Sequence, residues 1–555
     1  MAGKGEILAD IRIAVSPLAD MLLNACDRVP AKEALVFPTG RKSYEQVAAS
    51  VMMRARGLIG LGIRPGDHVG ILLPSGIEFV ETLFAVAMVG GISVLMNARY
   101  KAPEVAYVAS NADLAAIVTN GQCDEHVDFV RRLNEAFPAI AACADPLELA
   151  LADAPRLRRL ILFGERSAPG FVGQAAFDEA GAGVAEHEVH CARLGVRLRD
   201  TAMILYTSGT SANPKGCLLS HEAICREAAN LARNRWEFSG DERVWSPMPL
   251  FHIAAMLAML GAVEVGGTFI GQPHFDAGES LRQIEAERAT MLFLPFVTFH
   301  QAMIAHPDWA ASDMSLVRLM NSCFGQMPKA VGDAYRAKMP QALQVGTMGM
   351  TEASGIVTTG GFDMDPELGF KTLGYPLAGI SVRIVDVDSG ADLPTGERGE
   401  VLVKGYNLLD GYYRDPTKTA EALRDGWYHT GDIGSLDEHG HLMFHGRFKD
   451  MLKVGGENVA AAEVEAVLAA HDGVLLAQVI GLPDARLAEV PAAFVQRSAG
   501  TDVGEDELIC FVKERIASFK VPRHIRFVED WPMGASKIQK FKLRQQLMQE
   551  LDLTD

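Results

Sequence analysis

The segment YTSGTSANPKG, from Tyr206 to Gly216, is the most informative stretch of this sequence. Five of its eleven residues carry hydroxyl groups, two are glycines, and Lys215 stands next to its end. An apolar run, Ala202 to Leu205, precedes the segment, and a helical pattern begins after Ser220. Backbone N–H groups, hydroxyls and one cation at the mouth of a strand are suited to binding a polyanion.

The Walker phosphate loop, G-x-x-x-x-G-K-[ST], is the obvious alternative for this segment. Gly209 and Lys215 have its spacing, but Pro214 replaces its second glycine and Gly216 replaces its magnesium-binding hydroxyl. A proline nitrogen cannot donate a hydrogen bond to phosphate. The pattern therefore excludes a P-loop, and it leaves open a plain surface turn, which is what most Ser/Thr/Gly clusters between apolar runs form.

Length, charge and cysteine usage limit the class of protein. The 555 residues exceed what one hydrophobic core serves, so two or more domains are expected. The net charge of −18 argues against nucleic-acid or anionic-membrane partners. Eight scattered cysteines without a C-x-x-C pair favour free thiols in a reducing compartment. With no signal peptide recognised, and an apolar run at Ile253 to Val263 too short for a bilayer, we expect a cytoplasmic protein without stable membrane insertion.

Strands and helices alternate early in the chain. The run HVGILL, beginning at His68, predicts a buried strand, Ile77 to Val89 predicts a helix, and Gly91 to Asn97 a second strand. A helix around Pro103 to Ser110 and a strand from Leu114 to Thr119 continue the series. This order indicates βαβ units and a parallel sheet.

In the rest of the chain, the composition and the predicted secondary structure differ from one region to the next. Residues 138–158 are alanine-rich and predict a helical insertion, whereas residues 376–444 combine glycines with short β-like runs and predict a small antiparallel unit. GRFKDMLKVGGENV, residues 446–459, has the composition of a linker, and roughly one small domain's length follows it. Near the end, PMGASKIQKFKLR places Lys537 and Lys540 on a predicted loop.

Three short motifs contain polar residues suited to catalysis or ligand binding. Each of them also has a purely structural interpretation. His252, in PLFHIAAM, is alone more often a core or helix-start residue than a functional one. Thr351 and Glu352, on a glycine-containing turn, suit phosphate and a hard cation or merely cap a helix. Asp432, in YHTGD, suits the two hydroxyls of a ribose or forms an Asx turn.

Together these segments resemble the adenylate-forming superfamily of acyl-CoA synthetases, luciferases and peptide-synthetase adenylation domains. The match runs from about residue 15 to 545, with six motifs in the family's order: YTSGTSANPKG, PLFH, GMTE, YHTGD, GRFKDMLKVGGENV and SKIQK. The resemblance implies an α/β fold with a large N-terminal domain, residues 1–448, built of two doubly wound subdomains plus a distorted β-barrel. A small, mobile α+β domain, residues 449–555, follows the hinge residue Lys449.

The reaction that the resemblance implies has two steps. A carboxylate attacks the α-phosphorus of MgATP to give an acyl-adenylate and pyrophosphate, and the thiol of coenzyme A then displaces AMP. A medium-sized aliphatic, alicyclic or aryl acid is expected, because the candidate pocket is mostly apolar. Alternatives are a ligase that loads a carrier-protein phosphopantetheine, a luciferase-like oxygenase, and a catalytically silent nucleotide-binding homologue. A homodimer is left open.

Residue roles follow from the same resemblance. Three residues are expected to be catalytic: Lys537, Thr351 and His252. The expected ATP and AMP contacts are Thr207, Ser208, Gly209, Thr210, Ser211, Lys215, Gly325, Thr347, Met348, Gly349, Met350, Asp432 and Arg447. The expected coenzyme A contacts are His252, Gly455, Gly456 and Glu457. The acyl pocket is assigned to Ala254, Ala255, Phe296, Val297, Phe324, Ser354 and Ile356, and magnesium to Glu352.

The sequence departs from the family pattern at three places. Met348 stands where the family usually stacks adenine on an aromatic ring, and a thioether covers less of a purine. Phe324 replaces a small residue, which reshapes the expected acyl pocket. Ser536 replaces the glycine before Lys537, with one residue apparently deleted, so Lys540 is the alternative catalytic lysine if the register differs.

Overall fold

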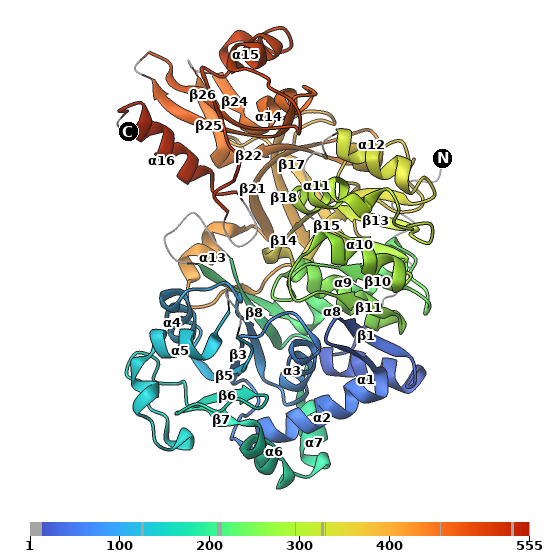
Figure 1. Cartoon of the computed structure of the whole chain (residues 1–555), viewed down its shortest axis with the longest axis vertical. Helices are drawn as coiled ribbons and strands as arrows, with labels where there is room; N and C mark the ends of the chain where they lie inside the picture. Colours follow the sequence, from blue (N-terminus) through green and yellow to red (C-terminus); the bar gives the residue numbers. More distant parts are fainter. Residues whose placement is uncertain are drawn as a thin grey trace.

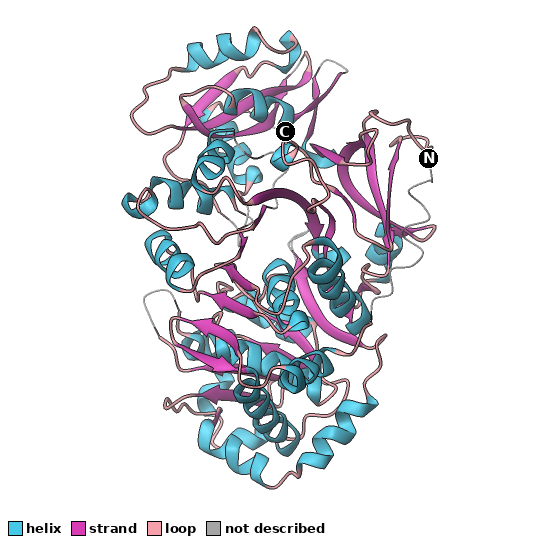
Figure 2. Cartoon of the chain, turned by 90° about the vertical axis from the view of Figure 1, so that its right-hand side faces the viewer, coloured by secondary structure: helices cyan, strands magenta, loops and turns pink. Residues whose placement is uncertain are grey.

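The computed structural model describes residues 14–123, 127–207, 214–294, 296–322, 327, 329–454, 457–484, 486–533 and 538–553. The side chains of residues 297, 329, 449, 453, 457, 458 and 488 also lie outside the description. The described residues form four sheets with helices packed around them (Figure 2).

The first sheet is mostly parallel. Its order is β19 (Gly411–Tyr412), β9 (Lys215–Ser220), β8 (Thr201–Thr207), β4 (Ile92–Leu95), β3 (His68–Ile71), β5 (Leu114–Asn120), β6 (Arg159–Phe163), β7 (Val172–Gly173). Neighbours from β8 to β7 run parallel, while β9 and β19 are antiparallel to theirs. The helices of this part are α1 (Leu18–Arg28), α2 (Tyr44–Gly60), α3 (Ile77–Met88), α4 (Ala102–Asn111), α5 (Phe129–Ala136), α6 (Gln174–Ala182) and α7 (Glu186–Gly195).

The second sheet is built in the same way. Its order is β16 (Tyr375–Pro376), β15 (Gly355–Thr359), β14 (Leu343–Met350), β13 (Leu319–Ser322), β12 (Met291–Phe293), β10 (Arg243–Ser246), β11 (Thr268–Gly271), β1 (Glu33–Phe37), β2 (Gly40–Ser43). Strands from β14 to β1 are parallel. Its helices are α8 (His221–Ala229), α9 (Ile253–Val265), α10 (Ala277–Ala286), α11 (Val297–Ala305) and α12 (Lys329–Lys338).

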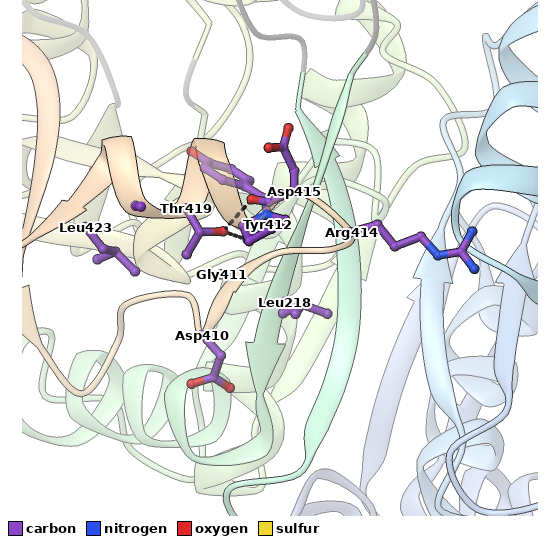
Figure 3. Close-up of a pocket in the computed structure, with 10 residues that line it drawn as sticks. Leu218, Asp410, Gly411, Tyr412, Arg414, Asp415, Thr419 and Leu423 are labelled. Atoms are coloured by element: carbon purple, nitrogen blue, oxygen red, sulfur yellow. Dashed lines mark hydrogen bonds between the residues drawn. The ribbon is translucent and has the colours of Figure 1, made fainter.

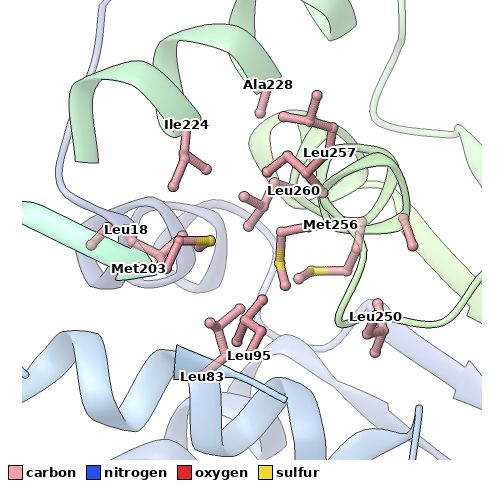
Figure 4. Close-up of a cluster of buried hydrophobic side chains, with 14 of the residues drawn as sticks. Leu18, Leu83, Leu95, Met203, Ile224, Ala228, Leu250, Met256, Leu257 and Leu260 are labelled. Atoms are coloured by element: carbon pink, nitrogen blue, oxygen red, sulfur yellow. The ribbon is translucent and has the colours of Figure 1, made fainter. Parts of the chain in front are cut away.

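Both sheets are apolar on both faces, as parallel strands covered by helices must be. Along β8, Met203 and Leu205 enter one cluster with α3 and α9, while Ile204 enters another with α4 and α5. The first of these clusters also takes residues from the second sheet, such as Val244. Figure 4 shows its centre, where side chains of α1, α3, α8 and α9 meet those of β4 and β8. This shared core joins the two doubly wound subdomains.

The third sheet is antiparallel and follows the two subdomains. Its path is β17 (Ile380–Val385), β18 (Gly399–Gly405), β21 (Trp427–Leu436), β20 (Leu423–Arg424), with β22 (Leu442–Arg447) paired to β21. Helix α13 (Pro416–Ala422) precedes β20. The predicted antiparallel unit at residues 376–444 is therefore present.

The fourth sheet forms a small α+β unit after a 3-10 turn at Phe448–Asp450. Its strands are β24 (Glu457–Ala460), β23 (Met451–Val454), β26 (Ala488–Arg497), β25 (Val474–Asp484) and β27 (His524–Phe527). They pack with α14 (Ala461–Ala469), α15 (Glu505–Lys513) and α16 (Lys540–Glu550). Figure 1 shows this unit at the end of the molecule opposite to α6 and α7. The Gln301 side-chain amide, on α11, donates to the Leu475 carbonyl at 3.1 Å and so links the unit to the main body.

Three local expectations need correction. Residues 138–158 form no α-helix but two 3-10 turns, Pro138–Ala142 and Pro146–Glu148, because a helix over this range would have to pass Pro146 and Pro155, which lack a backbone N–H. The helix predicted after Ser220 begins at His221 as expected, but strand β9, which the sequence pattern did not predict, lies between the hydroxyl-rich segment and this helix. Lys540 is the first residue of α16 rather than a loop residue.

A buried histidine fixes α1 against α8. Nδ1 of His221, the first residue of α8, accepts a hydrogen bond from the Leu18 amide at 3.2 Å. Burial lowers the pKa of His221 from 6.5 to about 4. Because the folded pKa lies below the unfolded one, neutral His221 stabilises the fold fully above pH 6.5, and this stabilisation is lost as the pH falls towards 4.

We therefore expect acid to weaken this contact. Between pH 7 and pH 5 the wild type should lose about 2 kcal/mol of folding free energy from His221, measured as a fall in the urea unfolding midpoint. In His221→Asn the amide oxygen accepts from Leu18 without titrating, so this variant should lose less. An equal fall in both proteins would contradict the assignment.

Candidate active site

The hydroxyl-rich segment is held at both ends. Thr207 ends β8 opposite Lys215 at the start of β9, and the two strands pair antiparallel. On one side the Tyr206 hydroxyl donates to Asn111 Oδ1 at 2.6 Å, and on the other the Tyr107 hydroxyl donates to the Pro214 carbonyl at 3.1 Å. These contacts with α4 place Thr207 and Lys215 side by side. The predicted contacts Ser208, Gly209, Thr210 and Ser211 lie outside the described residues.

The GMTE motif forms the turn predicted for it. Strand β14 ends at Met350, and a 3-10 turn, Thr351–Ala353, follows. The Leu409 amide donates to the Glu352 carbonyl at 2.8 Å, which anchors this turn to the chain entering β19. A Cβ at Gly349 would lie 2.3 Å from the Gly355 carbonyl oxygen, so a glycine is required where β14 and β15 approach.

Two other predicted nucleotide contacts on β14 are engaged within the protein. The Thr347 hydroxyl donates to Thr359 Oγ1 at 2.7 Å and accepts from the Asn321 side chain. Met348 is 5% exposed and belongs to the central apolar cluster. Met350, by contrast, is only partly buried. Their contacts with nucleotide stay predictions.

A buried tyrosine joins Glu352 to Lys215. The Tyr412 hydroxyl donates to Glu352 Oε1 at 3.2 Å, and Lys215 Nζ lies 4.2 Å from the centre of the Tyr412 ring. The Tyr428 hydroxyl is 3.3 Å from that of Tyr412. Burial, and next the charge of Glu352, raise the pKa of Tyr412 well above its usual value. The structure thus gathers Lys215 and Glu352, which are far apart in sequence.

The predicted ribose ligands lie on two paired strands of the third sheet, and Asp432 is on the strand that carries Tyr428. Asp432 is four residues after Tyr428 on β21 and pairs with Arg447 on β22. Arg447 Nε lies 3.1 Å from Asp432 Oδ1.

A bend in β21 positions Asp432. Gly431 has φ +67°, a conformation that favours glycine, and its amide donates to Glu400 Oε1 at 3.2 Å. The Thr430 hydroxyl accepts from the Asp432 amide at 2.9 Å and donates to the Val401 carbonyl at 2.8 Å. The local geometry therefore accounts for Thr430 and Gly431, whereas Asp432 enters these contacts through its backbone amide.

His252 is the N-cap residue of α9, and its ring centre lies 4.7 Å from that of Phe251. This is the helix-start position of the structural alternative, and the catalytic and coenzyme A-binding roles of His252 stay predictions. The start of β15 packs on α9, since a Cβ at Gly355 would meet Leu257 Cδ1 at 2.1 Å. Of the candidate acyl-pocket residues, Ala254 and Ala255 lie on α9, Ile356 lies on β15, and Ser354 immediately precedes β15.

The acyl-pocket candidates differ in exposure. Ala255, Ser354 and Ile356 are buried, and Ser354 has φ +51°. Ala254 and Phe296 are partly buried and pack against the central cluster. Outside the described residues or side chains lie Val297, Phe324, Gly325, Lys449, Gly455, Gly456, Glu457 and Lys537.

Lys540, the alternative catalytic lysine, has a partner within the small unit. Its Nζ donates to Glu465 Oε1 at 2.6 Å, and the same oxygen accepts from the Val479 amide at 2.7 Å. The ion pair ties the start of α16 to α14 and β25. This gives Lys540 a structural role.

A surface pocket of about 410 Å³ lies beside the site, between β9, β19 and α13 (Figure 3). Its wall includes Asp410, Arg414 and Asp415, together with the backbone of Tyr412. None of the residues predicted from sequence lines it. The nucleotide assignment therefore rests on Lys215, Glu352 and Asp432, not on this pocket.

Family models cover both parts of the chain. Residues 22–413 match the AMP-binding enzyme family, and residues 463–537 match the AMP-binding enzyme C-terminal domain. The chain belongs to the AMP-binding enzyme family. The predicted membership of the adenylate-forming superfamily and the predicted α/β fold with a large N-terminal and a small C-terminal domain are confirmed.

Named relatives of this AMP-binding enzyme are CoA ligases. It is 33% identical to a feruloyl-CoA synthase of Amycolatopsis sp over 506 residues, 90% of this chain and 93% of that protein. It is 32% identical to a mitochondrial medium-chain acyl-CoA ligase of Danio rerio over 551 residues, 97% of this chain and 89% of that protein. An anthranilate CoA ligase in complex with anthranoyl-AMP has TM-score 0.83 at 25% identity, over 98% of this chain and 100% of that chain. The prediction of an enzyme is confirmed.

In the part of the chain that the structure describes, every helix of this AMP-binding enzyme is too short or too polar to cross a membrane.

Two tyrosines at the site, Tyr412 and Tyr428, were not among the residues predicted from the sequence. Tyr428 opens the YHTGD motif, which was the available signal for it, whereas Tyr412, in GYY, lies outside the recognised motifs and had no such signal.

Proposed function

We propose that this AMP-binding enzyme is an acid–CoA ligase: it activates a carboxylic acid with MgATP to an acyl-adenylate and transfers the acyl group to coenzyme A. The observation that carries the proposal is the junction of Lys215 and Glu352 at Tyr412. The Tyr412 hydroxyl also lies beside that of Tyr428 on β21, four residues before Asp432 on the same strand. A cation, a carboxylate and a ribose acceptor on neighbouring elements form a nucleotide-binding arrangement.

In the first step two anions must meet, and charge accumulates at the α-phosphorus. Residues 207–211 and Lys215 would hold the β- and γ-phosphates, and Thr351 the α-phosphate. Lys537, entering with the small domain, would neutralise the carboxylate and a phosphate oxygen. Fixed donors placed where charge develops are the main source of acceleration in such reactions.

Glu352 fits the demands of a magnesium site. It is partly exposed, and one of its oxygens accepts from Tyr412. Within the described residues no three His, Cys, Asp or Glu side chains cluster. Magnesium bound with a nucleotide usually takes one or two carboxylates, with phosphate oxygens and water completing its shell, so Glu352 alone suffices on the protein side. When bound, the ion would offset phosphate charge.

In the second step the small domain would turn about Lys449 and withdraw Lys537. Gly455, Gly456 and Glu457 would then meet the pantetheine arm, with His252 at the entrance. The thiol sulfur attacks the acyl carbonyl, and the bond to AMP breaks. One site thus serves two steps by domain rotation. The CoA-ligase relatives favour this route over carrier loading or a silent nucleotide-binding homologue.

The proposed acid is medium-sized and aliphatic, alicyclic or aryl. Ala255 and Ile356 are buried apolar side chains, and Phe296 packs beside Phe299 with ring centres 5.3 Å apart. An apolar pocket of this kind binds a hydrocarbon or aryl body and disfavours a second carboxylate, because burying an unpaired charge is strongly unfavourable.

A screen of acids by pyrophosphate release tests both the proposed reaction and the proposed class of acid. We expect release with medium-chain and aryl acids, and at least about tenfold less with dicarboxylates of the same length, since a buried unpaired charge outweighs the added contacts. Thioester formation is then followed with free coenzyme A and with a phosphopantetheinylated carrier protein. If none of the acids tested gives ATP–pyrophosphate exchange, the result supports the silent homologue. A preference for dicarboxylates would contradict the apolar pocket.

A further inference from the structure

We propose that Tyr412 is a positioning residue that holds Glu352 and Lys215 in place for binding the magnesium–triphosphate group. The inference rests on the proposed function, which assigns Glu352 to magnesium and Lys215 to the phosphates. It adds a residue whose hydroxyl and ring serve two different partners. The two contacts are separable by substitution.

The hydroxyl of Tyr412 is oriented by a chain of hydrogen bonds. It donates to Glu352 Oε1 at 3.2 Å, and a carboxylate can only accept. Because Tyr412 has one proton, the Tyr428 hydroxyl, 3.3 Å away, must donate to Tyr412. Both tyrosines are buried. In a buried setting such a chain polarises each bond and restricts the carboxylate to one orientation.

The ring of Tyr412 serves the lysine. Lys215 Nζ lies 4.2 Å from the ring centre, within the range of a cation–π contact. A lysine side chain is flexible, so a surface that restrains it lowers the entropy lost when the lysine binds phosphate. The Tyr412 ring thereby keeps the Lys215 ammonium near the Glu352 carboxylate and leaves the positive charge of the ammonium available to phosphate.

Tyr412 is itself rigidly placed. It forms part of β19 opposite Cys217 on β9, and its amide donates to Thr419 Oγ1 at 2.9 Å. Thr419 in turn donates to the Asp415 carbonyl at 2.8 Å, and both bonds are visible in Figure 3. The strand that begins at Lys215 and the strand that carries Tyr412 are thus hydrogen-bonded together. A displaced Tyr412 would disturb both partners at once.

Tyr412→Phe separates the two contacts, because it removes the hydroxyl and keeps the ring. ATP binding is measured by calorimetry without acid substrate, once with magnesium and once with EDTA. We expect Tyr412→Phe to weaken ATP binding about tenfold with magnesium, as befits one hydrogen bond to a charged group. In EDTA its binding should match the wild type, because Lys215 keeps its restraint.

Tyr413→Phe is the matched control. The Tyr413 hydroxyl also donates to a carboxylate, Asp113 Oδ2, at 2.8 Å, but it does not touch Glu352. This variant should bind ATP as the wild type does in both buffers. Tyr428→Phe should give a smaller loss than Tyr412→Phe, because it removes only the outer hydroxyl of the chain.

Glu352→Gln completes a double-mutant cycle. If Tyr412 acts through Glu352, then Tyr412→Phe adds nothing to Glu352→Gln. Should Tyr412→Phe prove unstable, Glu352→Asp draws the carboxylate away from an intact tyrosine and tests the same link by the same measurement.

The outcomes separate the inference from the proposed function. A Tyr412→Phe enzyme with wild-type magnesium dependence, beside a Glu352→Gln enzyme that lacks it, would overturn the inference and leave the function standing. Additive losses in the double variant would also overturn it. Wild-type protein that binds no ATP in either buffer would overturn the proposed function itself.

Discussion

Lys537→Ala is expected to reduce acyl-adenylate formation by about 10²- to 10³-fold, the usual loss when one group that stabilises transition-state charge is removed. Thioester formation from pre-made acyl-adenylate should stay largely intact, because the small domain withdraws this lysine before the thiol attacks. The two half-reactions are measured separately, as pyrophosphate release and as conversion of synthetic acyl-adenylate with coenzyme A. The separation of these rates identifies a residue that serves only the first step.

Lys540→Ala is the control for that substitution. Lys540 is bound to Glu465 at 2.6 Å, so its loss should lower the stability of the small unit and leave adenylation nearly unchanged. If Lys540→Ala abolishes adenylation and Lys537→Ala does not, the catalytic register is shifted by three residues. If Lys537→Ala slows both half-reactions equally, the proposal that Lys537 leaves the site before the second step is wrong.

Asp432→Ala should raise the KM for ATP about 100-fold. A carboxylate that accepts both ribose hydroxyls makes two charged hydrogen bonds, each contributing about 1.5–3 kcal/mol. The variant also leaves Arg447 without the carboxylate that lies 3.1 Å from its Nε. Steady-state kinetics with a saturating acid give KM and kcat, and the loss should fall mainly on KM.

Comparison with 2′-deoxy-ATP tests whether the ribose is the partner. The wild type should discriminate against the deoxynucleotide, and Asp432→Ala should discriminate much less, because the acceptor for the 2′-hydroxyl is gone. A variant that prefers ATP as strongly as the wild type would place the ribose elsewhere. General loss of folding is checked by thermal unfolding, since Asp432 is 7% exposed.

Patterns local in the chain were enough for much of the fold. Alternating apolar runs predicted the strands at His68, Gly91 and Leu114 and the helix beginning at Ile77, within a few residues of their bounds. They failed at residues 138–158, where alanine content suggested a helix but prolines begin two short 3-10 turns. They also missed strand β9, because a six-residue run after a loop has little period to measure.

By itself, then, the sequence determined the family, the order of its motifs and the residue types available for chemistry, since motifs of this kind are contiguous in the chain. Only the tertiary structure decided which of those residues meet. Lys215, Glu352 and Tyr412 are separated by more than a hundred residues or by a change of sheet, and Tyr412 looks in sequence like one more strand residue. Its role arises because β19 pairs with β9 while the turn after β14 faces them, a long-range packing outcome that no local pattern encodes.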